Sequence, residues 1–250
     1  MTRTRAAIAA AAAVGALSIV AVIALPGATA APSCLGHAAT IVDGPGSSHI
    51  QGTQGNDVIF AGAGDDTVAS GDGQDLVCGD EGNDTMDAGT GDDQMDGGDG
   101  NDELHGYNGD DHVEGGPGRD FLDGRRGRKD VLIAGSGNDR LIGGTLLDGG
   151  GGDDHLNSQG YRKETTSDRM KGGAGDDRLK GDSQTGPGER MDGGSGADEL
   201  SGADGDDELA GGGGPDELRG DSGDDSLDGG SGTDSCDQGS GTGPSTGCEH

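Results

Sequence analysis

GTQGNDVIF, residues 52–60, decides the fold, because the chain repeats its pattern almost without a break. Seven further nine-residue units follow it directly: AGAGDDTVA, SGDGQDLVC, GDEGNDTMD, AGTGDDQMD, GGDGNDELH, GYNGDDHVE and GGPGRDFLD, which ends at Asp123. Position 4 of each unit is Gly, position 6 is Asp and position 8 is apolar. A fixed period of this kind predicts an architecture in which each repeat stacks on the next.

Each unit predicts a turn followed by a very short strand. Glycine in positions 1 to 6 permits the left-handed backbone angles of a turn, and in positions 7 to 9 only the middle side chain points inward. Two units form one 18-residue coil, and successive coils pair in parallel about 4.8 Å apart. Residues 18 apart therefore become neighbours, which stacks Asp57, Asp75, Asp93 and Asp111 on one face and Asp66, Asp84, Asp102 and Asp120 on the other. The apolar position 8 forms two inner columns: Ile59, Val77, Met95 and Val113, and Val68, Met86, Leu104 and Leu122.

The units match the nonapeptide G-G-x-G-x-D-x-U-x, and over residues 43–237 the chain resembles the RTX (repeats-in-toxin, haemolysin-type) calcium-binding family. The resemblance implies an all-β fold, a right-handed parallel β-roll (a β-solenoid of nonapeptide repeats) with several Ca²⁺ ions between its turns. It also implies that position-6 Asp side chains and backbone carbonyls hold each ion. The candidate metal ligands are Asp57, Asp66, Asp75, Asp84, Asp93, Asp102, Asp111, Asp120, Asp130, Asp139, Asp154, Asp168, Asp177, Asp198, Asp207, Asp216, Asp225 and Asp234.

These aspartates do not all lie in equally regular surroundings. The runs Asp57 to Asp120 and Asp198 to Asp234 are clean, whereas insertions surround the others, so some of those are expected to lack a stacked neighbour: Asp130, Asp139, Asp154, Asp168 and Asp177. Glu189 stands where an Asp belongs, and its longer side chain keeps it out of the candidate set.

Composition supports a role for a metal in folding. Apolar residues make up 28% of the chain and aromatic residues 2%, while 58 of 250 residues are Gly, so ordinary apolar burial cannot hold such a chain together. Stacked carboxylates cannot all ionise unless a cation lies between them. Calcium fits, because it takes about 6–8 oxygen ligands in irregular geometry, whereas Mg²⁺ demands a tighter octahedron. We therefore expect a chain that is disordered without calcium and a compact roll with it.

The first 30 residues predict a secretory signal peptide. A short basic start (MTRTR) precedes an uncharged Ala-rich run, and Ala28-Thr29-Ala30 is a small-x-small cleavage signal. An uncleaved membrane anchor is the alternative, since about 20 apolar residues can span a bilayer. Cleavage leaves 14 Lys and Arg against 48 Asp and Glu, a net charge of −34. The mature chain is then expected to be secreted without stable membrane insertion, and its charge argues against a nucleic-acid partner.

The domain organisation follows from where the repeat keeps its frame. We expect a signal peptide (1–30), an N-terminal cap (31–42), a regular roll (43–123), interrupted repeats with loop insertions (124–192), a second regular roll (193–237) and a C-terminal tail or cap (238–250). Residues 43–51 form a degenerate first repeat, with Ser48 in place of Asp.

Four cysteines in an exported chain favour two disulfides over a metal site, and three connectivities are possible. The favoured pairing is Cys34 with Cys78 and Cys236 with Cys248, one near each end. The first pair requires the segment before Val42 to leave the coil and fold back along its flank.

The leading functional hypothesis is an exported calcium-binding protein whose roll folds on binding Ca²⁺ through stacked G-x-D turns. The alternative is a calcium-dependent adhesion or assembly module that binds glycan or protein through insertions at 124–133 and 158–167. No nucleophile elbow, zincin helix or phosphate-binding loop is present, so no enzymatic activity and no catalytic residue is expected.

Overall fold

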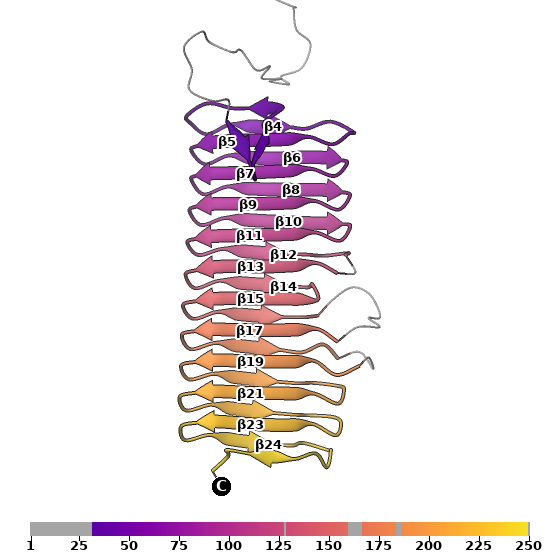
Figure 1. Ribbon diagram of the computed structural model, residues 1–250, viewed down its shortest axis with the longest axis vertical. Helices are drawn as coiled ribbons and strands as arrows, with labels where there is room; N and C mark the ends of the chain where they lie inside the picture. The colour runs from indigo at the N-terminus through magenta and orange to yellow at the C-terminus, as the bar shows by residue number, and fades with distance from the viewer. Residues whose placement is uncertain (1–31, 128, 160–166, 184–186, 250) are drawn as a thin grey trace, which may run out of the picture.

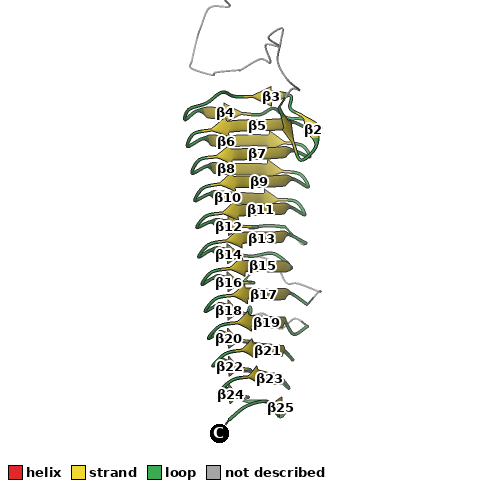
Figure 2. Cartoon of the chain, turned by 60° about the vertical axis from the view of Figure 1, so that its left-hand side comes forward, coloured by secondary structure: helices red, strands yellow, loops and turns green. Residues whose placement is uncertain are grey.

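A computed structural model describes residues 32–127, 129–159, 167–183 and 187–249 (Figure 1). The chain winds into a parallel β-solenoid in which each coil contributes one strand to each of two facing sheets (Figure 2). In this part of the chain the odd-numbered strands β3 to β25 form a 12-stranded sheet and the even-numbered strands β4 to β24 form an 11-stranded sheet. The predicted all-β parallel roll is therefore confirmed.

The strand bounds reflect the nonapeptide period. The 12-stranded sheet contains β3 (Ile41–Val42), β5 (Val58–Ala63), β7 (Leu76–Glu81), β9 (Gln94–Asp99), β11 (His112–Pro117), β13 (Val131–Ser136), β15 (Leu146–Gly151), β17 (Arg169–Ala174), β19 (Arg190–Ser195), β21 (Glu208–Gly213), β23 (Ser226–Ser231) and β25 (Ser245–Thr246). The 11-stranded sheet contains β4 (His49–Gln51), β6 (Thr67–Asp72), β8 (Thr85–Thr90), β10 (Glu103–Asn108), β12 (Phe121–Asp123), β14 (Arg140–Ile142), β16 (His155–Asn157), β18 (Arg178–Lys180), β20 (Glu199–Ser201), β22 (Glu217–Arg219) and β24 (Ser235–Asp237).

The predicted signal peptide, residues 1–30, lies outside the described residues. Within the described ranges, no helix is long and apolar enough to cross a bilayer.

Most strands are longer than predicted. In β5 and β6, for example, pairing continues from positions 7–9 into positions 1–3 of the next unit, as Gly62 pairs with Asp80 and Gly71 with Gly89. The prediction of three-residue strands was wrong there, because the first three positions still form parallel backbone hydrogen bonds. From β12 onward the strands of the 11-stranded sheet do have three residues.

The core consists of the two predicted columns of inward-facing side chains. Ile59 is in register with Val77, which is in register with Met95, and the facing sheet stacks Val68 on Met86 in the same way. The columns continue through the interrupted region as Leu132, Leu147, Met170 and Met191, and as Leu141, Leu156, Leu179 and Leu200. All of these side chains are at most 2% exposed. The core is only two side chains wide, so burial alone contributes little per coil.

Coil length varies, but the variation is confined to one edge of the solenoid. Stacked aspartates are separated by 18 residues in the regular part and by 19, 15, 23 and 21 residues in the interrupted part. The turns that follow the odd-numbered strands stay uniform, and we call this side the regular edge (left in Figure 1). The turns that follow the even-numbered strands contain the insertions, and we call this side the interrupted edge. The stacking of strands is therefore preserved while loops change length.

Both favoured disulfides are present. Cys34 is bonded to Cys78 with their Cα atoms 5.6 Å apart, and Cys236 to Cys248 at 5.8 Å. The segment before Val42 leaves the coil as predicted: β1 (Ser33–Cys34) and β2 (His37–Ala38) form an antiparallel hairpin that contacts β5 and β7 on the flank (Figure 2). At the other end β25 pairs with β23, so Cys248 follows a strand that extends the 12-stranded sheet.

Gly91 shows why position 4 requires glycine. Its φ is +143°, and a Cβ there would lie 1.4 Å from the carbonyl oxygen of Gly73 in the preceding coil. Gly91→Ala is therefore expected to destabilise the calcium-bound roll by about 3 kcal/mol or more, as measured by urea unfolding. Gly151→Ala is the matched control, because no heavy atom lies within 4 Å of its Cβ position. Equal losses in the two variants would contradict this view of the turn.

Candidate metal centres

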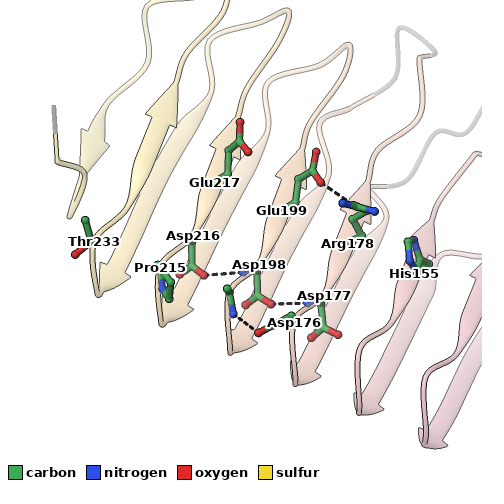
Figure 3. A pocket seen from close by; sticks show the side chains of 11 residues that line it. His155, Asp176, Asp177, Arg178, Asp198, Glu199, Pro215, Asp216, Glu217 and Thr233 are labelled. Atoms are coloured by element: carbon green, nitrogen blue, oxygen red, sulfur yellow. Dashed lines mark hydrogen bonds and ion pairs between the residues drawn. The ribbon is translucent and has the colours of Figure 1, made fainter.

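The regular edge contains an unbroken ladder of aspartates. The backbone N–H of Asp66 donates to Oδ1 of Asp84, and the same bond recurs in every coil down to Asp216 and Asp234, at 2.7–3.0 Å. Figure 3 shows the bonds that join Asp177 to Asp198 and Asp198 to Asp216. Ser48, at the position of a missing aspartate, begins the ladder by donating its N–H to Asp66. Asp139, Asp154 and Asp177 were expected to be at risk of losing their neighbours, but they keep them because the insertions fall on the other edge.

In most of the position-6 aspartates of both edges, the second carboxylate oxygen has no hydrogen-bond partner among the described residues. It is buried in each case, and the residues are at most 3% exposed: Asp66, Asp75, Asp84, Asp93, Asp102, Asp111, Asp120, Asp139, Asp154, Asp177, Asp198, Asp207, Asp216, Asp225 and Asp234. A buried oxygen without a partner costs free energy. A column of them is the donor set expected around a hard cation.

Glycine at position 1 leaves room beside these oxygens. A Cβ on Gly149 would lie 2.4 Å from Oδ2 of Asp154 and 2.7 Å from the carbonyl oxygen of Gly172 in the next coil. The same pair of oxygens, one carboxylate and one carbonyl, converges beside further glycines on the regular edge: Gly79, Gly97, Gly172, Gly193, Gly211 and Gly229. Neutral carbonyls and carboxylates from two adjacent coils are ligands that suit Ca²⁺. The residues present therefore fit calcium between the turns.

Burial shifts the titration of the ladder. It raises the pKa of Asp84, Asp102 and Asp198 to about 6 and of Asp120, Asp154 and Asp177 to about 7, with a further increase from neighbouring carboxylates. Backbone N–H donors oppose the shift without cancelling it. Without a cation, the folded ladder thus holds protons that an unfolded chain would release.

This shift predicts how pH acts on the calcium-free chain. The folded-state pKa values of about 6–7 exceed the ordinary value of 3.8, so folding takes up protons and the calcium-free roll gains stability as pH falls from about 7 towards 4. Far-UV circular dichroism of the chelator-treated chain is expected to show more β-structure at pH 4.5 than at pH 7.5. Sedimentation must show a monomer, since the low net charge at pH 4.5 favours association. A coil spectrum at both pH values would contradict the prediction.

The interrupted edge is a ladder in two parts. Asp57, Asp75, Asp93, Asp111 and Asp130 stack first, with N–H to Oδ1 distances of 2.8–3.0 Å. Thr145 occupies the next coil, where the sequence lacks the Gly-x-Asp segment. Asp168 and Glu189 follow, and the N–H of Glu189 donates to Asp207 and that of Asp207 to Asp225.

Asp57 differs from the three aspartates that follow it in the same column, Asp75, Asp93 and Asp111. Its Oδ2 accepts hydrogen bonds from the backbone N–H and the hydroxyl of Thr53, at 2.7 and 2.8 Å. The first carboxylate of the interrupted edge is thus held by its own turn, whereas Oδ2 of Asp75, Asp93 and Asp111 below it has no hydrogen-bond partner among the described residues.

Asp182 was missed by the sequence reasoning. Carboxylate oxygens of Asp168, Asp182 and Glu189, all buried, lie within 4.8 Å of one another. Burial and a hydrogen bond with Asp207 raise the pKa of Glu189 to about 9. Asp182 lies outside the Gly-x-Asp frame, at the start of an insertion, so periodicity alone could not identify it.

A second set of side chains also joins the coils. Position-5 Asn and Asp residues accept the N–H of the following coil, as Asp65 does from Asn83, and Asn83 from Asn101. At position 6 each N–H donates to a side chain in the next coil, whereas at position 5 it donates to a side chain in the preceding coil. The position-5 side chains lie on the exposed surface. The recurrence of Asn and Asp at position 5 was the available sequence signal.

A family model described as the RTX calcium-binding nonapeptide repeat matches residues 43–77, 79–113, 96–128, 127–145, 165–185, 188–218 and 211–242. None of the curated proteins searched matches the chain.

Proposed function

This chain belongs to the RTX calcium-binding nonapeptide repeat family, and on that premise we propose that it is an exported calcium-binding protein whose β-roll folds when Ca²⁺ ions bind between its stacked G-x-D turns. The observation that supports this most strongly is the set of buried carboxylate oxygens without hydrogen-bond partners among the described residues. Most of them lie beside a position-1 glycine and, on the regular edge, a carbonyl oxygen of the next coil. We propose the 18 position-6 aspartates as ligands, with Asp57 the weakest because Thr53 already holds it.

Charge supports binding of several ions. The mature chain has a net charge of −34, and about fifteen Ca²⁺ ions would bring about 30 positive charges if nearly every adjacent pair of turns is filled. Without them the stacked carboxylates in the turns repel one another, and a core only two side chains wide offsets little of that repulsion. The binding free energy of calcium then supplies much of the folding free energy.

Export is supported by the sequence of residues 1–30 and by the disulfides. Disulfides persist in oxidising compartments, where both the Cys34–Cys78 and Cys236–Cys248 bonds would be stable. External calcium would then be the trigger for folding. We propose no catalytic role for the chain.

The number of bound ions tests the proposal. Residues 31–250 with intact disulfides are dialysed to equilibrium against calcium, while small-angle scattering follows the radius of gyration. About ten to fifteen ions and a contraction on binding are expected. Binding of only one or two ions, or binding without contraction, would rule the proposal out.

A calcium-dependent adhesion or assembly module is the second candidate. The observation in its favour is that the insertions at 124–133 and 158–167 both follow strands of the 11-stranded sheet, β12 and β16. Arg125 orders the first of them by lying 4.4 Å from the Tyr107 ring and 3.0 Å from Asp123. Most of the second lies outside the described residues. Replacing Arg125, Arg126, Arg128 and Lys129 by Ser and deleting residues 159–166 keeps Asp130 and β13 in place. These changes would abolish calcium-dependent binding to a glycan or protein partner if this candidate holds, and leave calcium binding unchanged.

A further inference from the structure

Nearly all of the positive charge in residues 31–250 lies in one stretch. Residues 31–118 contain no Lys or Arg and 19 Asp or Glu, and residues 191–250 contain one Arg and 16 Asp or Glu. Thirteen of the 14 basic residues lie between Arg119 and Arg190, where they equal the 13 acidic residues in number. A solenoid maps sequence position onto position along its axis, so a belt without net charge separates two strongly acidic ends.

Part of this belt forms a groove on the outer face of the 11-stranded sheet. Arg140, His155 and Arg178 are in register at the start of β14, β16 and β18, and Asn157 and Lys180 are in register at the end of β16 and β18. Between these two columns lies a hollow of about 350 Å³, lined by these five residues together with Leu141 and Leu156. No carboxylate lines it. We call it the basic groove.

The cations of the basic groove are only partly neutralised. Arg178 pairs with Glu199 at 2.6 Å (Figure 3), and the guanidinium of Arg140 lies 5.8 Å from the Phe121 ring. Among the residues that the structure describes, no carboxylate forms an ion pair with Arg140 or Lys180. On the opposite sheet two of the basic residues are paired, Lys171 with Asp148 at 3.7 Å and Arg190 with Glu208 at 3.2 Å.

From this arrangement we propose that the basic groove binds an extended acidic polysaccharide. The groove crosses three coils, about 4.8 Å apart, along the solenoid axis, which suits a linear chain with spaced carboxylate or sulfate groups. The proposal goes beyond calcium binding, because it uses neither the turn aspartates nor the loop insertions.

A second copy of this chain fits the groove less well. Strands of three residues give a face about 10 Å wide, so β14 to β24 offer about 300 Å², well below the about 800 Å² that each partner buries in a standard interface. Hence the width of the sheet argues against a dimer through this face.

Nucleic acid also fits less well. Carboxylates border the groove on the side of β20 and β22, where Asp176, Glu199 and Glu217 line a second hollow of about 370 Å³ (Figure 3). These would repel a densely charged polymer, and the groove lining contains no Phe, Tyr or Trp on which a base could stack.

The test compares two variants with equal changes in charge. Arg140→Gln, Arg178→Gln and Lys180→Gln together remove the groove cations, while Arg169→Gln, Lys171→Gln and Arg190→Gln remove three from the opposite sheet. Binding of the calcium-loaded mature chain to immobilised carboxymethyl dextran and dextran sulfate is measured, with neutral dextran as reference. The two charged polymers distinguish carboxylate from sulfate recognition.

The groove variant is expected to bind at least one charged dextran about tenfold more weakly or worse, and the opposite-face variant within about twofold of the parent. Raising ionic strength should release the bound chain. Lys180→Glu, a single exposed change, provides a second variant should the triple one fail to fold. Calcium titration of each variant separates this outcome from the calcium proposal. No binding to either charged dextran, equal losses in both triple variants, or tighter groove-dependent binding of a single-stranded oligonucleotide would overturn the inference.

Discussion

Asp154→Asn is expected to raise the calcium concentration at the folding midpoint by about tenfold or more. Asp154 is fully buried, its Oδ2 has no hydrogen-bond partner among the described residues, and that oxygen faces the space beside Gly149. An asparagine keeps the Oδ1 that accepts the N–H of Asp139, but it places an amide NH₂ where the structure provides an oxygen. The variant therefore removes a charged metal ligand with little change in shape.

Asp153→Asn is the matched control, one residue away. Asp153 is exposed, and its Oδ1 accepts the N–H of Asp176, a bond that asparagine preserves. Its calcium midpoint is expected to stay within about twofold of the parent. Calcium titrations followed by circular dichroism compare the two. Equal shifts would mean that bulk negative charge, and not a specific ligand, governs folding.

Replacing Cys34 and Cys78 by Ser is expected to cost the calcium-bound roll about 4 kcal/mol, the loop-closure value for a 44-residue separation. This bond also ties the β1–β2 hairpin to β7, next to the first coil of the stack. Its loss should therefore expose the N-terminal edge of the sheets as well as loosen the unfolded chain.

The control for this prediction is the other disulfide. The Cys236–Cys248 bond closes a loop with a separation of only 12 residues, so replacing both cysteines by Ser is expected to cost about 3 kcal/mol. Urea unfolding at saturating calcium, without reductant, measures both. A larger loss of unfolding free energy on removing the C-terminal disulfide would contradict the view that the N-terminal hairpin stabilises the roll more.

The period of nine made most of the fold predictable. It placed Ile59 on Val77 and Asp66 on Asp84, because identical positions 18 residues apart must stack in a two-unit coil. It also suggested that Cys34 lies on the flank, since a regular coil would have held it too far from Cys78 for a disulfide. Strand length was underestimated, because positions 1 to 3 were assigned to the turn although their backbone pairs with the neighbouring coil.

The interrupted region was harder to predict. A period shows that residues 124–192 depart from the frame, but not which edge absorbs the extra length. Placing every insertion on one edge leaves Asp139, Asp154 and Asp177 stacked, and it brings Asp182 beside Glu189. That outcome depends on strand register, which the inward Leu141, Leu156 and Leu179 maintain.

The most direct test of the central claim is far-UV circular dichroism of residues 31–250 during a calcium titration, with magnesium as control. The stacked carboxylates predict a coil spectrum that turns cooperatively to β-structure with calcium, while magnesium at the same concentrations leaves it a coil. A β-spectrum that is already complete in chelator at pH 7.5, or one that magnesium induces equally well, would contradict a roll folded by calcium.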